Sequence, residues 1–192
     1  MKLFRVLPYD ANAAPNERGG VLYVPGSTAG RIANADLYRE LYLSLEAEGA
    51  IAEVFGRLPI WQNSDFVRAD GTKLALTSYA LSDDAPIFDL DNVRALASFG
   101  IEHPSEVVTR NRKITQQWAR RIFESGRYIG VRWWSYYEPA WTSIGLWDIV
   151  RLRPLGRPEA LDTDHPLVAK TGRAIARQIE RSSRGGAVRD ER

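Results

Sequence analysis

Residues Gly30–Glu53 read GRIANADLYRELYLSLEAEGAIAE, and the rest of the chain can be arranged around them. Residues 41–45 alternate apolar and polar-capable side chains, which is typical of a short strand. From Glu46 the apolar residues recur at helical spacing, which predicts a helix over residues 46–58 with Ser44 as its cap. Glu53 is therefore expected on a helix that follows the strand of Tyr42, and Arg31 on the loop before that strand.

The remaining elements follow from periodicity and from Pro and Gly breakers. Strands are expected at residues 3–7, 21–24, 73–81, 87–90, 128–134 and 143–150. Further helices are expected at 92–98, capped by Asp91, at 112–124, and from Asp164 to about Arg181. The sequence thus predicts a single α+β domain with a mixed, mainly antiparallel sheet and helices packed against it.

The C-terminal region differs in composition from the rest. Pro154, Gly156 and Pro158 indicate a linker, so the main domain is expected at residues 1–155. A linker and an amphipathic helix are expected at 156–181 and a disordered tail at 182–192. The net charge of +2 arises in this region, because residues 151–192 carry 10 basic and 6 acidic side chains. A basic tail could contact nucleic acid or an acidic partner, but a solvated charged helix is the simpler interpretation.

Composition excludes several classes of protein. The chain has 192 residues, of which 44% are hydrophobic and 26% are charged, as in ordinary globular domains. It has no cysteine and only two histidines, which excludes a disulfide scaffold and a thiolate metal site. No metal site is predicted. No membrane-spanning run or signal peptide is recognised, so a cytoplasmic protein is expected.

Arg31 ends a Gly-flanked loop, residues 26–31, that lacks the Lys-Ser/Thr ending of a Walker motif. A guanidinium in that place can approach a diphosphate with two parallel donors. The simpler interpretations stay open: a solvated loop arginine for Arg31, a half-buried strand residue for Tyr42, and a surface carboxylate paired with Arg57 for Glu53.

Ser135 lies at the start of an aromatic segment, Ser135–Trp141, that follows a predicted strand. This segment could pack in the core, stack on a nicotinamide or adenine ring, or form a platform for a sugar or single-stranded nucleic acid. Ser135 lacks the glycines of a nucleophile elbow, so it is expected to act by hydrogen bonding.

Taken together, several of these residues resemble the signature of the RES domain, a family named for its Arg, Glu and Ser. The matching positions are Gly30-Arg31, Tyr42-Leu43-Ser44, Glu53, Gly130 and Ser135. Weaker similarity extends to Phe4–Val6, Ile87–Leu90 and Thr115–Ala119, so the resemblance covers roughly residues 3–150. The family often has Trp-Asn after Gly-Arg, whereas Ile32 follows Arg31 here.

The resemblance implies a toxin of a bacterial toxin–antitoxin pair, with an Xre-type antitoxin as partner and NAD as a substrate rather than a cofactor. It also implies a core similar to ADP-ribosyltransferases. Glu53 would then hydrogen-bond the ribose of NAD, Arg31 would hold the diphosphate, and Tyr42 would pack on the nicotinamide ribose or ring. Ser135 would orient Glu53 or the substrate, and Ser44 would belong to the NAD-binding residues.

The predicted function is cleavage of the nicotinamide–ribose bond of NAD, with growth arrest as its consequence. Water, inorganic phosphate or a protein side chain could accept the ADP-ribosyl group, and no residue decides among them. The alternatives are an ADP-ribosyltransferase that modifies a protein, or a non-catalytic module that binds protein or nucleic acid. In the toxin interpretation nucleic acid is reached only through the antitoxin.

Overall fold

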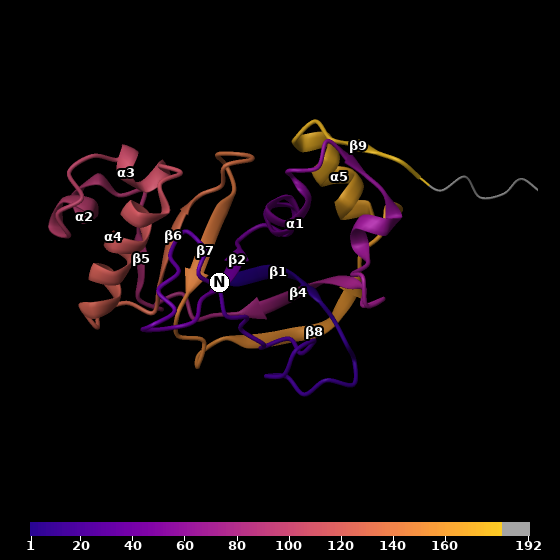
Figure 1. The fold of residues 1–192 in the computed structure, drawn as a ribbon, viewed down its shortest axis with the longest axis horizontal. Coiled ribbons are helices and arrows are strands. Elements are labelled where there is room, and N and C mark those ends of the chain that lie inside the picture. The colour runs from indigo at the N-terminus through magenta and orange to yellow at the C-terminus, as the bar shows by residue number, and fades with distance from the viewer. Residues whose placement is uncertain (182–192) are drawn as a thin grey trace, which may run out of the picture.

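The computed structural model describes residues 1–181, and it is built on a seven-stranded sheet in the order β5-β6-β7-β2-β1-β4-β8 (Figure 1). All neighbouring strands of this sheet are antiparallel except β5 and β6, which are parallel. A separate pair, β3 and β9, is parallel. The prediction of one α+β domain with a mainly antiparallel sheet is confirmed.

The strands and helices are interleaved along the chain. The strands are β1 (Lys2–Pro8), β2 (Leu41–Ser44), β3 (Ile60–Trp61), β4 (Leu74–Ala80), β5 (Ile87–Asp89), β6 (Gly130–Trp134), β7 (Thr142–Leu146), β8 (Arg153–Ala160) and β9 (Gln178–Ile179). The helices are α1 (Ala47–Phe55), a 3-10 turn at Asn63–Phe66, α2 (Val93–Ser98), α3 (Ser105–Val108), α4 (Arg112–Glu124) and α5 (Pro166–Ala174).

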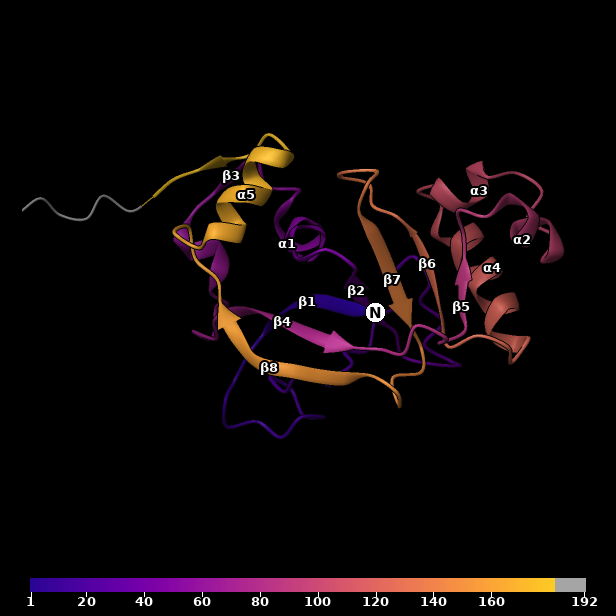
Figure 2. The same ribbon diagram turned by 180° about the vertical axis from the view of Figure 1, so that it is seen from behind.

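The helices form two groups at opposite ends of the sheet, with β7 between them (Figures 1 and 2). In the first group α1 packs on α5 and on β1, around a core that contains Ile51 and Phe55. In the second group α4 covers β5 and β6 through Trp118 and Ile122. Each group buries an amphipathic stripe of its helices against the sheet, as the spacing of apolar residues requires.

Both groups cover the same face of the sheet. Ser143 on β7 bonds to a residue of α1, and Gly145, two residues further on, meets Ile32 of the core that α4 covers. Residues two apart on a strand share a face. The opposite face carries a third core around Leu43 and Ile144. The strands β2, β7 and β6 therefore separate α1 from α4, and their side chains lie between the two helix groups.

Several local predictions are wrong. Residues 21–24 form no strand, because Leu22 and Val24 pack against the third core as a covering loop. The predicted linker around Pro154, Gly156 and Pro158 is the edge strand β8. The last helix ends at Ala174, and Gln178 and Ile179 then form β9. Residues 182–192, the expected disordered tail, lie outside the described residues.

The predicted caps are corrected as well. Asn92, not Asp91, caps α2 by accepting hydrogen bonds from the amides of Arg94 and Ala95. His165, not Asp164, caps α5. Within residues 1–181 no helix is long and apolar enough to span a membrane.

Candidate active site

Glu53 is an exposed residue near the end of α1, and its carboxylate is held by hydroxyl groups of the neighbouring strands. Ser135, just after β6, and Ser143 on β7 each donate a hydrogen bond of 3.2 Å to its Oε1 atom. Both serines are buried, so their hydroxyl positions are set by the sheet. No ion pair between Glu53 and Arg57 is found in the described part of the chain, so the interpretation as a simple helical pair is wrong.

The side chain of Tyr42, on β2, contacts the loop that carries Arg31. Its hydroxyl accepts a hydrogen bond of 3.2 Å from the amide of Ile32, while 36% of the residue remains exposed. Burial of the phenol raises the pKa of Tyr42, so the group stays protonated at neutral pH. A Cβ on Gly30 would lie 2.3 Å from the Tyr42 hydroxyl, which explains why the loop has glycine at this position.

Arg31 is partly buried, and its guanidinium faces the segment before α4. One of its nitrogen atoms donates to the carbonyls of Val107 and Thr109, the second at 3.4 Å. Burial and then the positive charge of Arg112 lower the pKa of Arg31, while Tyr42 and Glu53 raise it. Arg31 therefore lies within electrostatic reach of Arg112, Tyr42 and Glu53, and the two arginines form a local concentration of positive charge.

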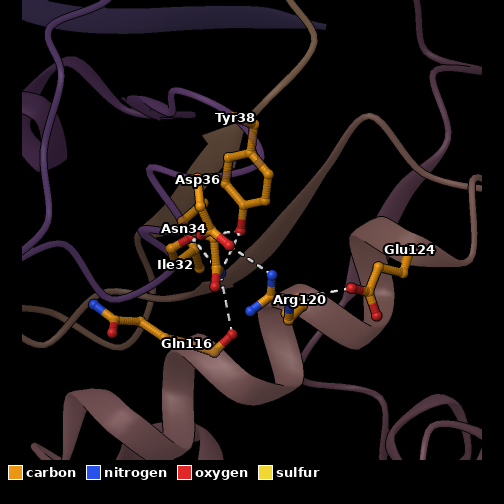
Figure 3. A network of polar contacts seen from close by, with 7 residues as sticks. All are labelled: Ile32, Asn34, Asp36, Tyr38, Gln116, Arg120 and Glu124. Atoms are coloured by element: carbon orange, nitrogen blue, oxygen red, sulfur yellow. Dashed lines mark hydrogen bonds and ion pairs between the residues drawn. The ribbon is translucent and has the colours of Figure 1, made fainter.

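The loop of Arg31 is tied to α4 by a network of polar contacts (Figure 3). The Asn34 side-chain amide donates to the Gln116 carbonyl at 3.1 Å, and Arg120 pairs with Asp36 at 2.6 Å. The Gln116 side chain in turn donates to the carbonyls of Thr28 and Gly30 at 3.1 and 3.0 Å. These contacts make α4 the support of the Gly-flanked loop that carries Arg31.

Among the predicted site residues, Glu53 and Ser135 are in contact, and the Tyr42 hydroxyl lies against the backbone on both sides of Arg31, at Gly30 and Ile32. Ser44 lies elsewhere: it is buried, donates to the Thr142 carbonyl at 3.1 Å and accepts from the Glu46 amide at 3.2 Å. Its hydrogen bonds therefore shape the turn between β2 and α1.

Sequence reasoning missed Ser143. Ser143 lies at the start of a strand that the sequence predicts. Only the pairing of β2 with β7, which sets Ser143 opposite Ser44, reveals that its hydroxyl faces Glu53. Among the described residues no group of three or more His, Cys, Asp or Glu side chains is placed to hold a metal ion.

The fold is similar to that of a chain in the crystal structure of the M. tuberculosis MbcT–MbcA toxin–antitoxin complex, with a TM-score of 0.58. The two chains are 13% identical, and the match covers 91% of this chain and 88% of that chain. The chain belongs to the RES domain family, whose model matches residues 2–167. A comparison with curated proteins finds no match.

Proposed function

We propose that this protein cleaves the bond between nicotinamide and ribose in NAD, acting in the cytoplasm as the toxin of a toxin–antitoxin pair. The observation that carries the proposal is the Glu53 carboxylate, exposed on α1 and held at one oxygen by Ser135 and Ser143. Membership of the RES family and the fold shared with a toxin–antitoxin complex support it.

The chemistry follows from the charge that the reaction creates. When the C1′–N bond breaks, the electron pair leaves with nicotinamide, which departs as a neutral molecule and needs no general acid. The ribose ring is left with oxocarbenium character, so a carboxylate held beside it stabilises the transition state more than the ground state. Glu53 uses Oε1 for the two serines, which leaves Oε2 for the ribose hydroxyls.

Arg31 and Arg112 supply the complementary charge for the diphosphate. Their mutual repulsion is unfavourable in the free protein, and a bound dianion would relieve it. Tyr42 accepts the Ile32 amide and makes a T-shaped contact with Trp133, with ring centroids 6.2 Å apart. Its partly exposed ring offers an aromatic surface for the nicotinamide ribose or ring.

The acceptor completes the reaction at C1′. Water gives ADP-ribose and a proton, inorganic phosphate gives ADP-ribose 1″-phosphate, and a protein nucleophile gives a modified protein. We propose hydrolysis or phosphorolysis, and the alternative is transfer to a protein, as an ADP-ribosyltransferase-like core would allow.

The experiment is nicotinamide release from NAD by the purified chain, with and without inorganic phosphate and with a protein extract as the third acceptor. Glu53→Gln keeps the shape of the side chain and removes its charge, so we expect turnover to fall about 100-fold or more, roughly 3 kcal/mol of transition-state stabilisation. Stimulation by phosphate or labelling of protein identifies the acceptor.

The matched control is Glu48→Gln on the same helix, whose carboxylate pairs with Lys170 on α5 rather than with the serines. It should keep wild-type turnover. Wild-type turnover in Glu53→Gln, with an unchanged melting temperature, would contradict the proposed role of Glu53.

The proposed partner is an antitoxin protein of the Xre type. Trp134 and Tyr136 flank Ser135 and expose 39% and 69% of their surface, as residues that a partner covers often do. Loss of nicotinamide release when the product of the adjacent gene is added would support the pairing.

A further inference from the structure

A cavity of about 330 Å³ is lined by residues at the ends of β5 and β6 and by residues of α2 and α3. Its wall is mainly apolar and includes Leu90, Val93 and Val107. The other lining residues include the aromatic Trp134, the acidic Asp91 and the hydroxyl residue Ser105. Ligand sites in proteins have this composition, an apolar hollow with a few placed polar groups, and this one is large enough for a single heteroaromatic base.

The cavity is joined to the active site through two of its lining residues. Trp134 directly precedes Ser135, whose hydroxyl bonds to Glu53. The carbonyl of Val107 accepts a hydrogen bond from Arg31. Arg31 therefore contacts one wall of the cavity and also lies within electrostatic reach of Glu53. In a dinucleotide the diphosphate likewise joins the ribose that reacts to the second base.

The chemistry of the cavity selects among bases. Trp134 exposes 39% of its surface and can stack on any heteroaromatic ring. Asp91 accepts the Trp134 amide at 3.3 Å through Oδ1, and its Oδ2 takes part in no hydrogen bond within residues 1–181. A carboxylate oxygen accepts but cannot donate at neutral pH, so it favours a ring with an exocyclic amine over one with a carbonyl at the same position.

We propose that this cavity binds the adenine base of NAD, with Trp134 stacked on the ring and Asp91 accepting a hydrogen bond from its 6-amino group. The inference rests on the proposed function and extends it to the half of the substrate that does not react. It makes the protein selective for an adenine dinucleotide over nicotinamide mononucleotide, which carries the same scissile bond but no second base.

The test compares three substrates that share the nicotinamide–ribose bond: NAD, nicotinamide hypoxanthine dinucleotide and nicotinamide mononucleotide. Val93→Trp fills the cavity, and because Val93 is 61% exposed the change should not disturb folding. We expect the ratio of kcat/KM for NAD to that for the mononucleotide to fall at least tenfold. Val150→Trp, at a position 89% exposed and outside the lining, is the matched control and should keep the ratio.

Asp91→Asn tests the amine contact, since the amide oxygen can still accept the Trp134 amide and its nitrogen becomes a donor. Wild-type protein should prefer NAD to the hypoxanthine dinucleotide by about tenfold, and this variant should lose or reverse the preference.

Three results overturn the inference alone: equal kcat/KM of the wild-type protein for NAD and the mononucleotide, parallel loss on both in Val93→Trp, or an unchanged base preference in Asp91→Asn. Failure of the wild-type protein to release nicotinamide from any of the three substrates is a different outcome. It overturns the proposed function, and the adenine site with it.

Discussion

At the scale of single residues, the candidate site is made by neighbours that are distant in sequence. Glu53 has the sequence context of an ordinary surface residue on a short helix. It becomes distinctive because Ser135 and Ser143, 82 and 90 residues later, place two hydroxyl donors on one of its oxygens. Such bonds restrict the rotamer of the carboxylate and so fix the direction in which its second oxygen points.

Removing these hydroxyls should affect catalysis more than binding. For Ser135→Ala and Ser143→Ala we expect kcat to fall about tenfold each, near 1.4 kcal/mol, with KM changed less than threefold. Steady-state kinetics of nicotinamide release measures the split. Ser64→Ala, at an exposed position in the 3-10 turn, serves as control. A rise in KM at constant kcat would show that the serines bind substrate instead of positioning Glu53.

At the scale of elements, α4 supports the loop that carries Arg31. Gln116 is central to this support because its side chain alone satisfies two loop carbonyls, those of Thr28 and Gly30. The neighbouring Gln117 is exposed, and no hydrogen bond of its side chain is found in the described part of the chain. Two adjacent glutamines thus differ in whether they hold the loop.

Gln116→Ala should loosen the loop while leaving the sheet intact. We expect a loss of about 1–2 kcal/mol in the free energy of unfolding, because the Thr28 carbonyl loses its side-chain donor and the Gly30 carbonyl keeps only the 3.3 Å bond from the Ala33 amide. We also expect a severalfold rise in KM for NAD. Hydrogen exchange should become faster at residues 28–34. Gln117→Ala should change none of these. Equal exchange rates in the two variants would contradict the supporting role of α4.

Sequence patterns predicted the elements whose signals are local. The strands at β1, β2 and β4 and the helix α4 were recognised because apolar periodicity and caps mark them. β8 was missed because Pro154 and Pro158 are tolerated only where a strand lies at the edge of a sheet, and edge position depends on the whole topology. Ser143 was missed for the same reason: its role needs the pairing of β2 with β7.

At the scale of the whole molecule, one buried carboxyl group makes stability depend on pH. Glu40 is only 2% exposed, and neither oxygen of its side chain has a hydrogen-bond partner within residues 1–181. Burial raises the pKa of Glu40 above its ordinary value of 4.5, and the nearby Ser27 hydroxyl offsets part of that rise. The folded protein therefore holds a proton that the unfolded chain releases as the pH rises past 4.5.

The raised pKa of Glu40 sets how the free energy of unfolding changes with pH. Stability from the protonated group is fully present below pH 4.5 and is lost as the pH rises through the folded-state pKa, by about 1.4 kcal/mol per pH unit between the two pKa values. Glu40→Gln removes this dependence, so its free energy of unfolding relative to wild type should increase between pH 4.5 and 8 in denaturant titrations. Glu17→Gln, at an exposed position, should follow wild type. Parallel curves for Glu40→Gln and wild type would contradict a raised pKa of Glu40 in the folded protein.

The pairing of β2 with β7 has a consequence for incomplete chains. Ser135 and Ser143 lie 82 and 90 residues after Glu53, so they are translated later, and β2 has no β7 to pair with until then. A chain interrupted between α1 and β6 carries Glu53 without either of its hydroxyl donors and leaves one edge of β2 unpaired. Under the proposed function, such a fragment should release no nicotinamide from NAD.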